Sequence, residues 1–204
     1  INAINDAPVL TGAGSSLLTD NGSNNFTAND QFTAIDEDNI TSSGNAVSTF
    51  LNAASVSDLE QGTPLGIAVT SAVNTNGRWQ FTLDGTTFTD FTPASASNST
   101  LLDGANPNHK IRFVPDLDFF GTATIKYRAW DKTDGRSAGQ EGNTSTTGGA
   151  AAFSLGEVTK TIIINSVNDQ PGANLLPVPP ILEDAPPVTI PNFSNPTSGA
   201  SQLE

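Results

Sequence analysis

The chain of 204 residues contains no cysteine and a single histidine, His109. Without cysteine it can form neither disulfide bonds nor thiolate zinc sites. A single histidine excludes sites that need two imidazoles, and the turn-like sequence around His109 predicts a surface position rather than a place in a catalytic triad. Methionine is also absent, which indicates a segment of a longer polypeptide. Most familiar enzyme sites are thus excluded, and we expect a non-enzymatic function.

Basic residues are scarce as well. The chain has eight Lys and Arg residues and 21 Asp and Glu residues, which gives a formal net charge of −13. Such a chain repels phosphate backbones, so we expect no nucleic-acid partner. No run approaches the roughly 20 apolar residues of a membrane span, and the first residues do not resemble a signal peptide, so we expect no membrane insertion. The hydrophobic fraction of 36% is nevertheless enough for a core.

A short sequence occurs twice. Residues 1–8 read INAINDAP and residues 164–171 read INSVNDQP, with five of eight positions identical. A looser echo relates Glu37-Asp38 to Glu183-Asp184. We favour a tandem repeat over a chance match in an Asn-rich chain. The chain is then expected to contain one module and the start of the next.

Composition divides the chain into three parts. Residues 1–30 are expected to hold the junction with a preceding module and a flexible insertion rich in Gly, Ser, Asn and Thr. Residues 31–171 are expected to form the module itself. Residues 172–204, rich in proline, are expected to be a linker and the start of the next module.

Alternating apolar and polar residues predict β-strands. The clearest pattern is a hairpin over residues 79–91, with Asp84-Gly85 suited to a type I′ turn. Alternation also predicts strands at 110–113 and 123–130. Runs of β-branched residues predict strands at 66–72 and 158–165, and 31–35 and 47–51 are weaker candidates. No window has a helical period with caps at both ends. We therefore expect an all-β fold, an antiparallel β-sandwich.

Several segments, in this order, resemble the cadherin-like repeats of large bacterial RTX adhesins. They are TAIDED at 33–38, VSDLEQG at 56–62, GIAVT at 66–70, GRWQF at 77–81, IRFVPD at 111–116, YRAWD at 127–131 and VND at 167–169. The chain is most similar to the calcium-dependent peptide-binding modules near the ligand-binding end of such adhesins. The resemblance implies a Greek-key, cadherin/Ig-like sandwich with long calcium-binding loops, located outside the cell on the bacterial surface.

Acidic residues cluster in the breaks between the expected strands. Calcium prefers six to eight hard oxygen ligands from loops, and like charges crowded into short loops repel one another unless a cation lies among them. The candidate calcium ligands are Asp36, Asp38, Asp58, Glu60, Asp116, Asp118, Asp131, Asp134 and Glu141, with Asp6 and Asp169 at the junctions. For any single cluster a solvated turn is an equal alternative. Taken together, the clusters favour several Ca²⁺ ions.

The loop over residues 131–152 is the candidate binding surface. A loop of this length in a compact domain is usually functional or disordered, and both alternatives are open. Arg136, Gln140 and Asn143 could hydrogen-bond a peptide, and a calcium ion could accept a carboxylate from its chain end. Trp130 is expected to border this loop or to stack on Lys126 or Arg128, which share its face by alternation.

Four basic residues are expected on the polar face of two paired strands: Lys110, Arg112, Lys126 and Arg128. They form either an anion-binding strip or a solvated face balanced by acids, and the solvated face is favoured.

These patterns lead to one main functional hypothesis and two alternatives. The main one is a monomeric calcium-dependent module of a secreted adhesin that binds a peptide or protein C-terminus on a target cell. The first alternative is a spacer that calcium stiffens against neighbouring modules of the same chain. The second is a calcium-dependent glycan-binding module, with Trp130 as its stacking platform. A hydrolase is the least favoured, because the sequence places no pair of carboxylates across a cleft.

Overall fold

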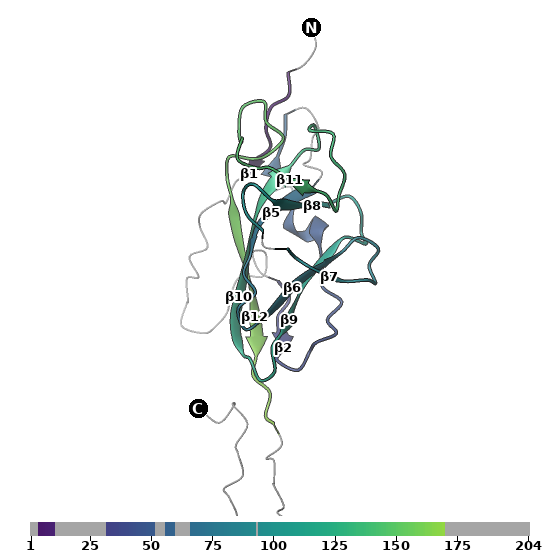
Figure 1. Cartoon of the computed structure of the whole chain (residues 1–204), viewed down its shortest axis with the longest axis vertical. Helices are drawn as coiled ribbons and strands as arrows, with labels where there is room; N and C mark the ends of the chain where they lie inside the picture. Colours follow the sequence, from purple (N-terminus) through teal and green to yellow (C-terminus); the bar gives the residue numbers. More distant parts are fainter. Residues whose placement is uncertain (1–3, 11–31, 52–55, 60–65, 93, 170–204) are drawn as a thin grey trace, which may run out of the picture.

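The computed structural model of the chain describes residues 4–10, 32–51, 56–59, 66–92 and 94–169 (Figure 1). The expected flexible insertion and the proline-rich residues 172–204 lie outside these ranges, and so does the candidate ligand Glu60.

The described residues form three sheets. The six-stranded sheet has the order β11 (Glu141–Gly142), β8 (Ser99–Asp103), β5 (Gly66–Ala72), β10 (Gly121–Trp130), β12 (Val158–Asn165), β2 (Ile35–Asp36). The four-stranded sheet has the order β3 (Asn45–Ala46), β9 (Lys110–Pro115), β6 (Gly77–Thr82), β7 (Thr89–Asp90), and β1 (Val9–Leu10) pairs with β4 (Val56–Ser57). All pairs are antiparallel except β12 with β2, which is parallel. In the described ranges, no helix has the length and apolar character that a membrane crossing requires.

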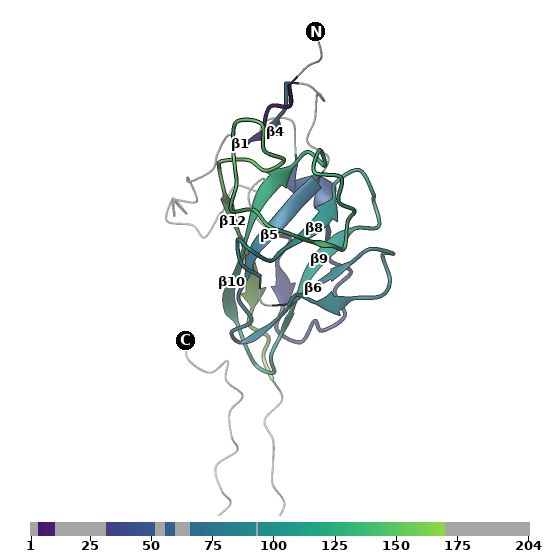
Figure 2. The same ribbon diagram turned by 45° about the horizontal axis from the view of Figure 1, so that its top comes forward.

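The all-β prediction is confirmed, and the arrangement is consistent with a β-sandwich (Figure 2). The expected strands at 66–72 and 158–165 match β5 and β12. Residues 47–51 were expected as a strand, but Val47–Phe50 forms a 3₁₀ turn (η1) that buries Val47 and Phe50. Strand β8 has no counterpart among the expected strands, because its first four residues are all buried and so show no alternation.

The hairpin is confirmed, but its turn differs from the expectation. Gln80 pairs with Asp90 and Phe81 with Thr89, so the connection is longer than a two-residue turn. Oδ1 of Asp84 accepts the backbone N–H groups of Thr87 at 2.7 Å and Thr86 at 2.8 Å. These bonds hold the pKa of Asp84 far below its usual range. A carboxylate therefore closes this loop, which removes the need for a type I′ turn.

The main core lies between the six- and four-stranded sheets. Trp79 on β6 is fully buried and contacts the rings of Phe32 and Phe113, with centroids 4.9 and 5.1 Å away. Inward-facing residues of β5, β10 and β12 complete the core from the other sheet. Burial of rings of this size dominates the energetics of the fold.

A second, smaller core covers the outer face of the six-stranded sheet. It consists of Ala68, Leu101, Trp130, Ala152 and Phe153. Ala68 and Leu101 alternate with Ile67 and Leu102 of the main core, which places them on the opposite face. The loop after β10 therefore packs on the sheet, with Phe153 beside Trp130.

The expected pairing of the two basic strands is wrong. Lys110 and Arg112 lie on β9 and Lys126 and Arg128 on β10, in different sheets. The Arg112 guanidinium donates to Oε1 of Gln80 at 2.8 Å, and the Arg128 guanidinium donates to the carbonyl oxygens of Ser154 and Leu155. The four basic residues therefore do not form one strip.

Candidate functional site

The folded part of the chain has two poles, at opposite ends of its long axis (Figure 1). The N-terminal pole comprises residues 4–10, β4 and the loop residues that contact them. The C-terminal pole comprises the end of β12, β2 with residues 37–40, and the β9–β10 turn at residues 116–120. This turn belongs there because Gly121 pairs with Ile164 near the end of β12.

Residues 4–8 are bonded to the loop after β10 at the N-terminal pole. The side-chain amide of Asn5 donates to Oδ2 of Asp131 at 3.1 Å. The backbone N–H of Ala7 donates to the carbonyl oxygen of Gly149 at 2.6 Å. These bonds join the start of the chain to a loop distant in sequence.

The Asp131 carboxylate is a buried anchor of this pole, with 1% of the residue exposed. Besides the bond from Asn5, its Oδ1 accepts the backbone N–H of Thr133 at 2.8 Å and the Thr133 hydroxyl at 2.7 Å. It therefore fixes both the first residues and the turn that opens the long loop.

A pocket of about 260 Å³ opens beside residues 4–8. It is lined by Asp6, Ala7, Val9, Ser57, Asp58, Leu59 and Gly149. The fold thus brings the predicted ligands Asp6 and Asp58 to one pocket from two distant segments. Carboxylate oxygens are among the ligands that Ca²⁺ prefers.

At the C-terminal pole the buried acid is Glu37, with 2% exposed. Its Oε1 accepts the backbone N–H of Val167 at 2.7 Å, and its Oε2 has no hydrogen-bond partner. Beside it, the side-chain amide of Asn165 donates to Oδ1 of Asp36 at 3.2 Å. The chain is therefore bonded to this pole as far as Val167.

The other predicted ligands at this pole lie in turns. Asp38 and Asp116 are exposed, and Asp118 has a φ of 57°, a left-handed conformation that Asp tolerates better than most residues. Asp169 is half-buried and is the last described residue.

Across the described ranges, no three histidine, aspartate or glutamate side chains are grouped closely enough to hold a metal ion. Asp6 and Asp58 share a pocket, whereas Asp36, Asp38, Asp116 and Asp118 lie at the opposite pole. Asp134 and Glu141 lie in the long loop. The calcium sites stay a prediction, for which the shared pocket is the best location.

In the long loop, Asp134 bonds its own neighbours. Its Oδ1 accepts the indole N–H of Trp130 at 3.0 Å and its Oδ2 pairs with Arg136 at 2.8 Å. Burial raises the pKa of Asp134, but the bonds from Arg136 and Trp130 outweigh burial and lower it. Asp134 therefore organises the loop as a charged acceptor.

The remaining loop candidates also make local bonds. Oε1 of Gln140 accepts the Ser137 N–H at 2.9 Å, and Oδ1 of Asn143 accepts the Ser145 N–H at 2.9 Å. Oε1 of Glu141 accepts the Asn98 side-chain amide at 2.9 Å. Arg136, Gln140, Glu141 and Asn143 are nevertheless exposed, so their outer atoms face solvent.

Trp130 is 0% exposed beneath the long loop, and its indole N–H donates to Asp134 of that loop, so it borders the loop as one of its two expected positions. The other alternative, stacking on Lys126 or Arg128, is wrong, because the cation over its ring is Lys132, 5.8 Å from the centroid.

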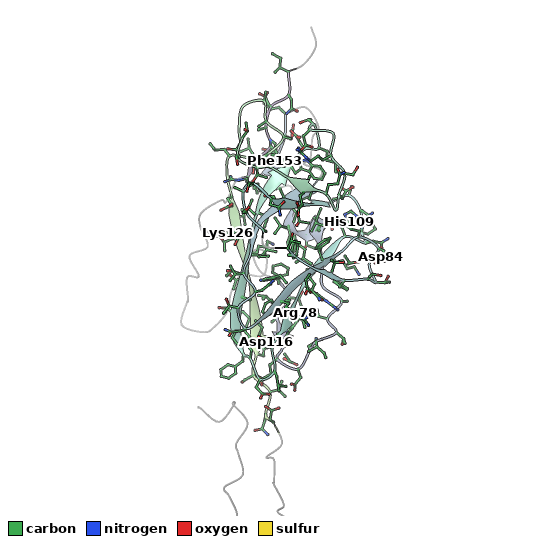
Figure 3. The ribbon with its side chains drawn as sticks, in the orientation of Figure 1. Arg78, Asp84, His109, Asp116, Lys126 and Phe153 are labelled. Carbon is green, nitrogen blue, oxygen red and sulfur yellow. The ribbon has the colours of Figure 1, made fainter. Side chains whose placement is uncertain are left out.

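His109, labelled in Figure 3, was expected at the surface but is only 6% exposed. Its Nδ1 accepts the backbone N–H of Asp103 at 2.9 Å. Burial, the largest effect, lowers the pKa of His109.

Two pole residues were not selected from the sequence. Glu37 belonged to an expected acidic cluster, but Asp36 and Asp38 were preferred as ligands. Asn5 lies in the repeated octapeptide, and its recurrence as Asn168 was the signal that could have identified it.

No protein-family model, curated protein or solved structure matches the chain.

Proposed function

We propose that the chain is a calcium-binding module of a large bacterial surface adhesin, in which similar modules follow one another. The observation that carries the proposal is the N-terminal pole, where Asp6 and Asp58 line one pocket and Asn5 binds the buried Asp131. Carboxylates, backbone carbonyls and water are the oxygen ligands that Ca²⁺ prefers. A cation in this pocket would offset the repulsion between the two carboxylates.

The role of calcium in this proposal is mechanical. The pocket lies between residues 4–8, β4 and the long loop, so an ion there would tie three separate segments together. Binding to the folded state alone stabilises it by mass action. A calcium-stiffened spacer is therefore the function that the geometry supports best.

Peptide recognition by the long loop is the second candidate. It is favoured by the hydrogen bonds that Asp134 and Asp131 accept at the start of the loop, while Arg136, Gln140 and Asn143 stay exposed. A pre-organised loop loses less entropy on binding. Arg136 would pair with the terminal carboxylate of a peptide. Trp130 would act only by supporting the loop, since it is buried.

The proposal includes the finer classification of the fold and its setting. We assign a Greek-key, cadherin/Ig-like sandwich, a monomeric state, a non-enzymatic role and a place outside the cell. Glycan binding ranks third because both tryptophans are 0% exposed and offer no stacking platform.

The test of the calcium proposal is thermal unfolding in calcium and in EDTA, with titration calorimetry. We expect calcium to raise the melting temperature by about 5 °C or more. Asp58→Asn should remove most of this rise, whereas the matched control Asp90→Asn, on the exposed strand β7 and outside the candidate calcium ligands, should keep it. Equal melting temperatures in calcium and EDTA would refute the proposal.

The peptide candidate is tested separately, with a library of peptides that have free C-terminal carboxylates. Binding that Arg136→Ala abolishes and Lys126→Ala preserves would support it. If no peptide binds while calcium raises the melting temperature, the spacer role alone stands.

A further inference from the structure

The two copies of the octapeptide lie at opposite poles. The second copy shows how the chain leaves the C-terminal pole, and the first copy shows how it enters the N-terminal pole. In the second copy, Ile164 and Asn165 end β12, and the N–H of Val167 is held by Glu37. In the first copy, Asn5 and Ala7 are bonded to the loop at the N-terminal pole.

Aligning the copies places Val167 at the position of Ile4 and Asn168 at the position of Asn5. Val167 is bonded to the module that the chain leaves. Asn5, the equivalent of the next residue, is bonded to the module that the chain enters. Consecutive Cα atoms are only about 3.8 Å apart, so no free residue separates the two anchors.

We propose that consecutive modules abut, with the C-terminal pole of one seated directly on the N-terminal pole of the next and no flexible linker between them. The occupant of the C-terminal pole is thus a following module of this same fold. This inference rests on the tandem arrangement in the proposed function and adds the geometry of the junction.

Exposed apolar side chains at both poles support direct contact. At the C-terminal pole, Ile40 is 59%, Leu117 86% and Phe120 42% exposed. At the N-terminal pole, Ile4 is 78% and Leu59 88% exposed. Large apolar side chains gathered at an exposed surface mark an interaction site, and an abutting module would remove them from water.

The charges at the poles oppose this contact. Asp36 and Asp38 at one pole would approach Asp6 and Asp58 of the next module, and like charges repel. Calcium at the junction would offset this repulsion, so the measurement below is made in calcium.

The experiment uses a tandem protein in which residues 1–167 of one copy continue directly into Asn5 of a second copy, which runs to residue 204. Because the chain has no cysteine, Thr124→Cys in each copy places one spin label on the exposed face of each β10. Double electron–electron resonance then measures the distance between the modules. The comparison is the same protein with a Gly/Ser segment between Val167 and Asn5.

We expect a single distance distribution, about twofold narrower than that of the protein with the Gly/Ser segment, whose flexible linker allows many orientations. Leu117→Ser in the first copy should broaden the distribution without lowering the melting temperature of the single chain. The matched control Leu83→Ser, on the side of the module, should leave the distribution narrow.

Equal widths with and without the Gly/Ser segment would overturn the abutment. If the calcium-dependent rise in melting temperature persisted in that case, the calcium proposal would stand. A narrow distance distribution, together with a melting temperature that calcium does not change, would support the abutment and refute the calcium proposal.

Discussion

The chain has two tryptophans, and each lies in a different hydrophobic core. Trp79 packs between the two sheets against Phe32 and Phe113. Trp130 lies on the outer face of the six-stranded sheet, beneath Ala152 and Phe153. Both are 0% exposed, yet strands bury the first and an irregular loop buries the second.

The comparison of the two tryptophans shows how an irregular segment can cover a hydrophobic core. Strands pair their backbone groups in ladders, whereas a loop must satisfy its backbone groups one at a time. Here the Ser154 hydroxyl accepts the Ala129 N–H at 3.0 Å, and Arg128 donates to the carbonyl oxygen of Ser154 at 3.2 Å. The outer core therefore depends on single polar contacts that the main core does not need.

Trp79→Ala should have the largest effect. We expect a loss of about 3–5 kcal/mol of unfolding free energy, because the surrounding strands cannot collapse into the cavity. Urea unfolding followed by circular dichroism measures the loss. A loss smaller than that of Trp130→Ala would contradict the ranking of the two cores.

Trp130→Ala should cost less, about 2–3 kcal/mol, because the covering loop can relax toward the cavity. We expect protease cleavage within residues 143–157 to become faster while the β-sheet circular dichroism persists. Trp79→Ala is the comparison, since it should expose the whole chain. Unchanged loop cleavage in Trp130→Ala would show that the loop is held independently of its core.

Asp134→Ala should cost about 1 kcal/mol, since it removes the acceptor of the Trp130 indole N–H. In a Trp79→Phe background, Trp130 is the single tryptophan, and its fluorescence should shift. The control Asp134→Asn keeps an acceptor oxygen and should shift it less. Equal shifts in both variants would argue against the hydrogen bond.

Acid should produce the smallest effect. The folded-state pKa of Asp134 is lowered, so its contribution is fully present above its unfolded pKa and is lost as the pH falls below about 4. The stability difference between the wild type and Asp134→Asn should therefore shrink in acid. Urea unfolding midpoints of the two proteins, measured across this pH range, test the prediction. A stability difference that does not change with pH would contradict a lowered pKa of Asp134.

Sequence patterns predicted those parts of the fold that local alternation or β-branched runs encode. Strand β10 follows from apolar residues on one face, and β5 and β12 follow from their β-branched residues. Strand β8 was not predicted from the sequence. Both of its faces are covered, so its residues do not alternate between apolar and polar. The strand expected at residues 47–51 was wrong because the buried residues there, Val47 and Phe50, are three positions apart, which matches one turn of a 3₁₀ helix and not the period of two of a strand.

The candidate sites were predicted less well than the strands. The acidic clusters indicated which loops carry charge, but not that Asp6 and Asp58 share a pocket or that Glu37 is buried. Trp130 was placed on the correct face of its strand. Its burial could not be predicted, because the loop that covers it has no periodic pattern.

The sequence by itself determined the exclusion of cysteine and paired-histidine chemistry, the all-β class and the repeated octapeptide. Composition and short-range periodicity carry that information within a few residues. Only the tertiary structure decided that Asn5 meets Asp131, that Glu37 holds Val167 and that a loop buries Trp130. Each of these contacts joins segments far apart in the chain, and their meeting depends on how the whole chain packs.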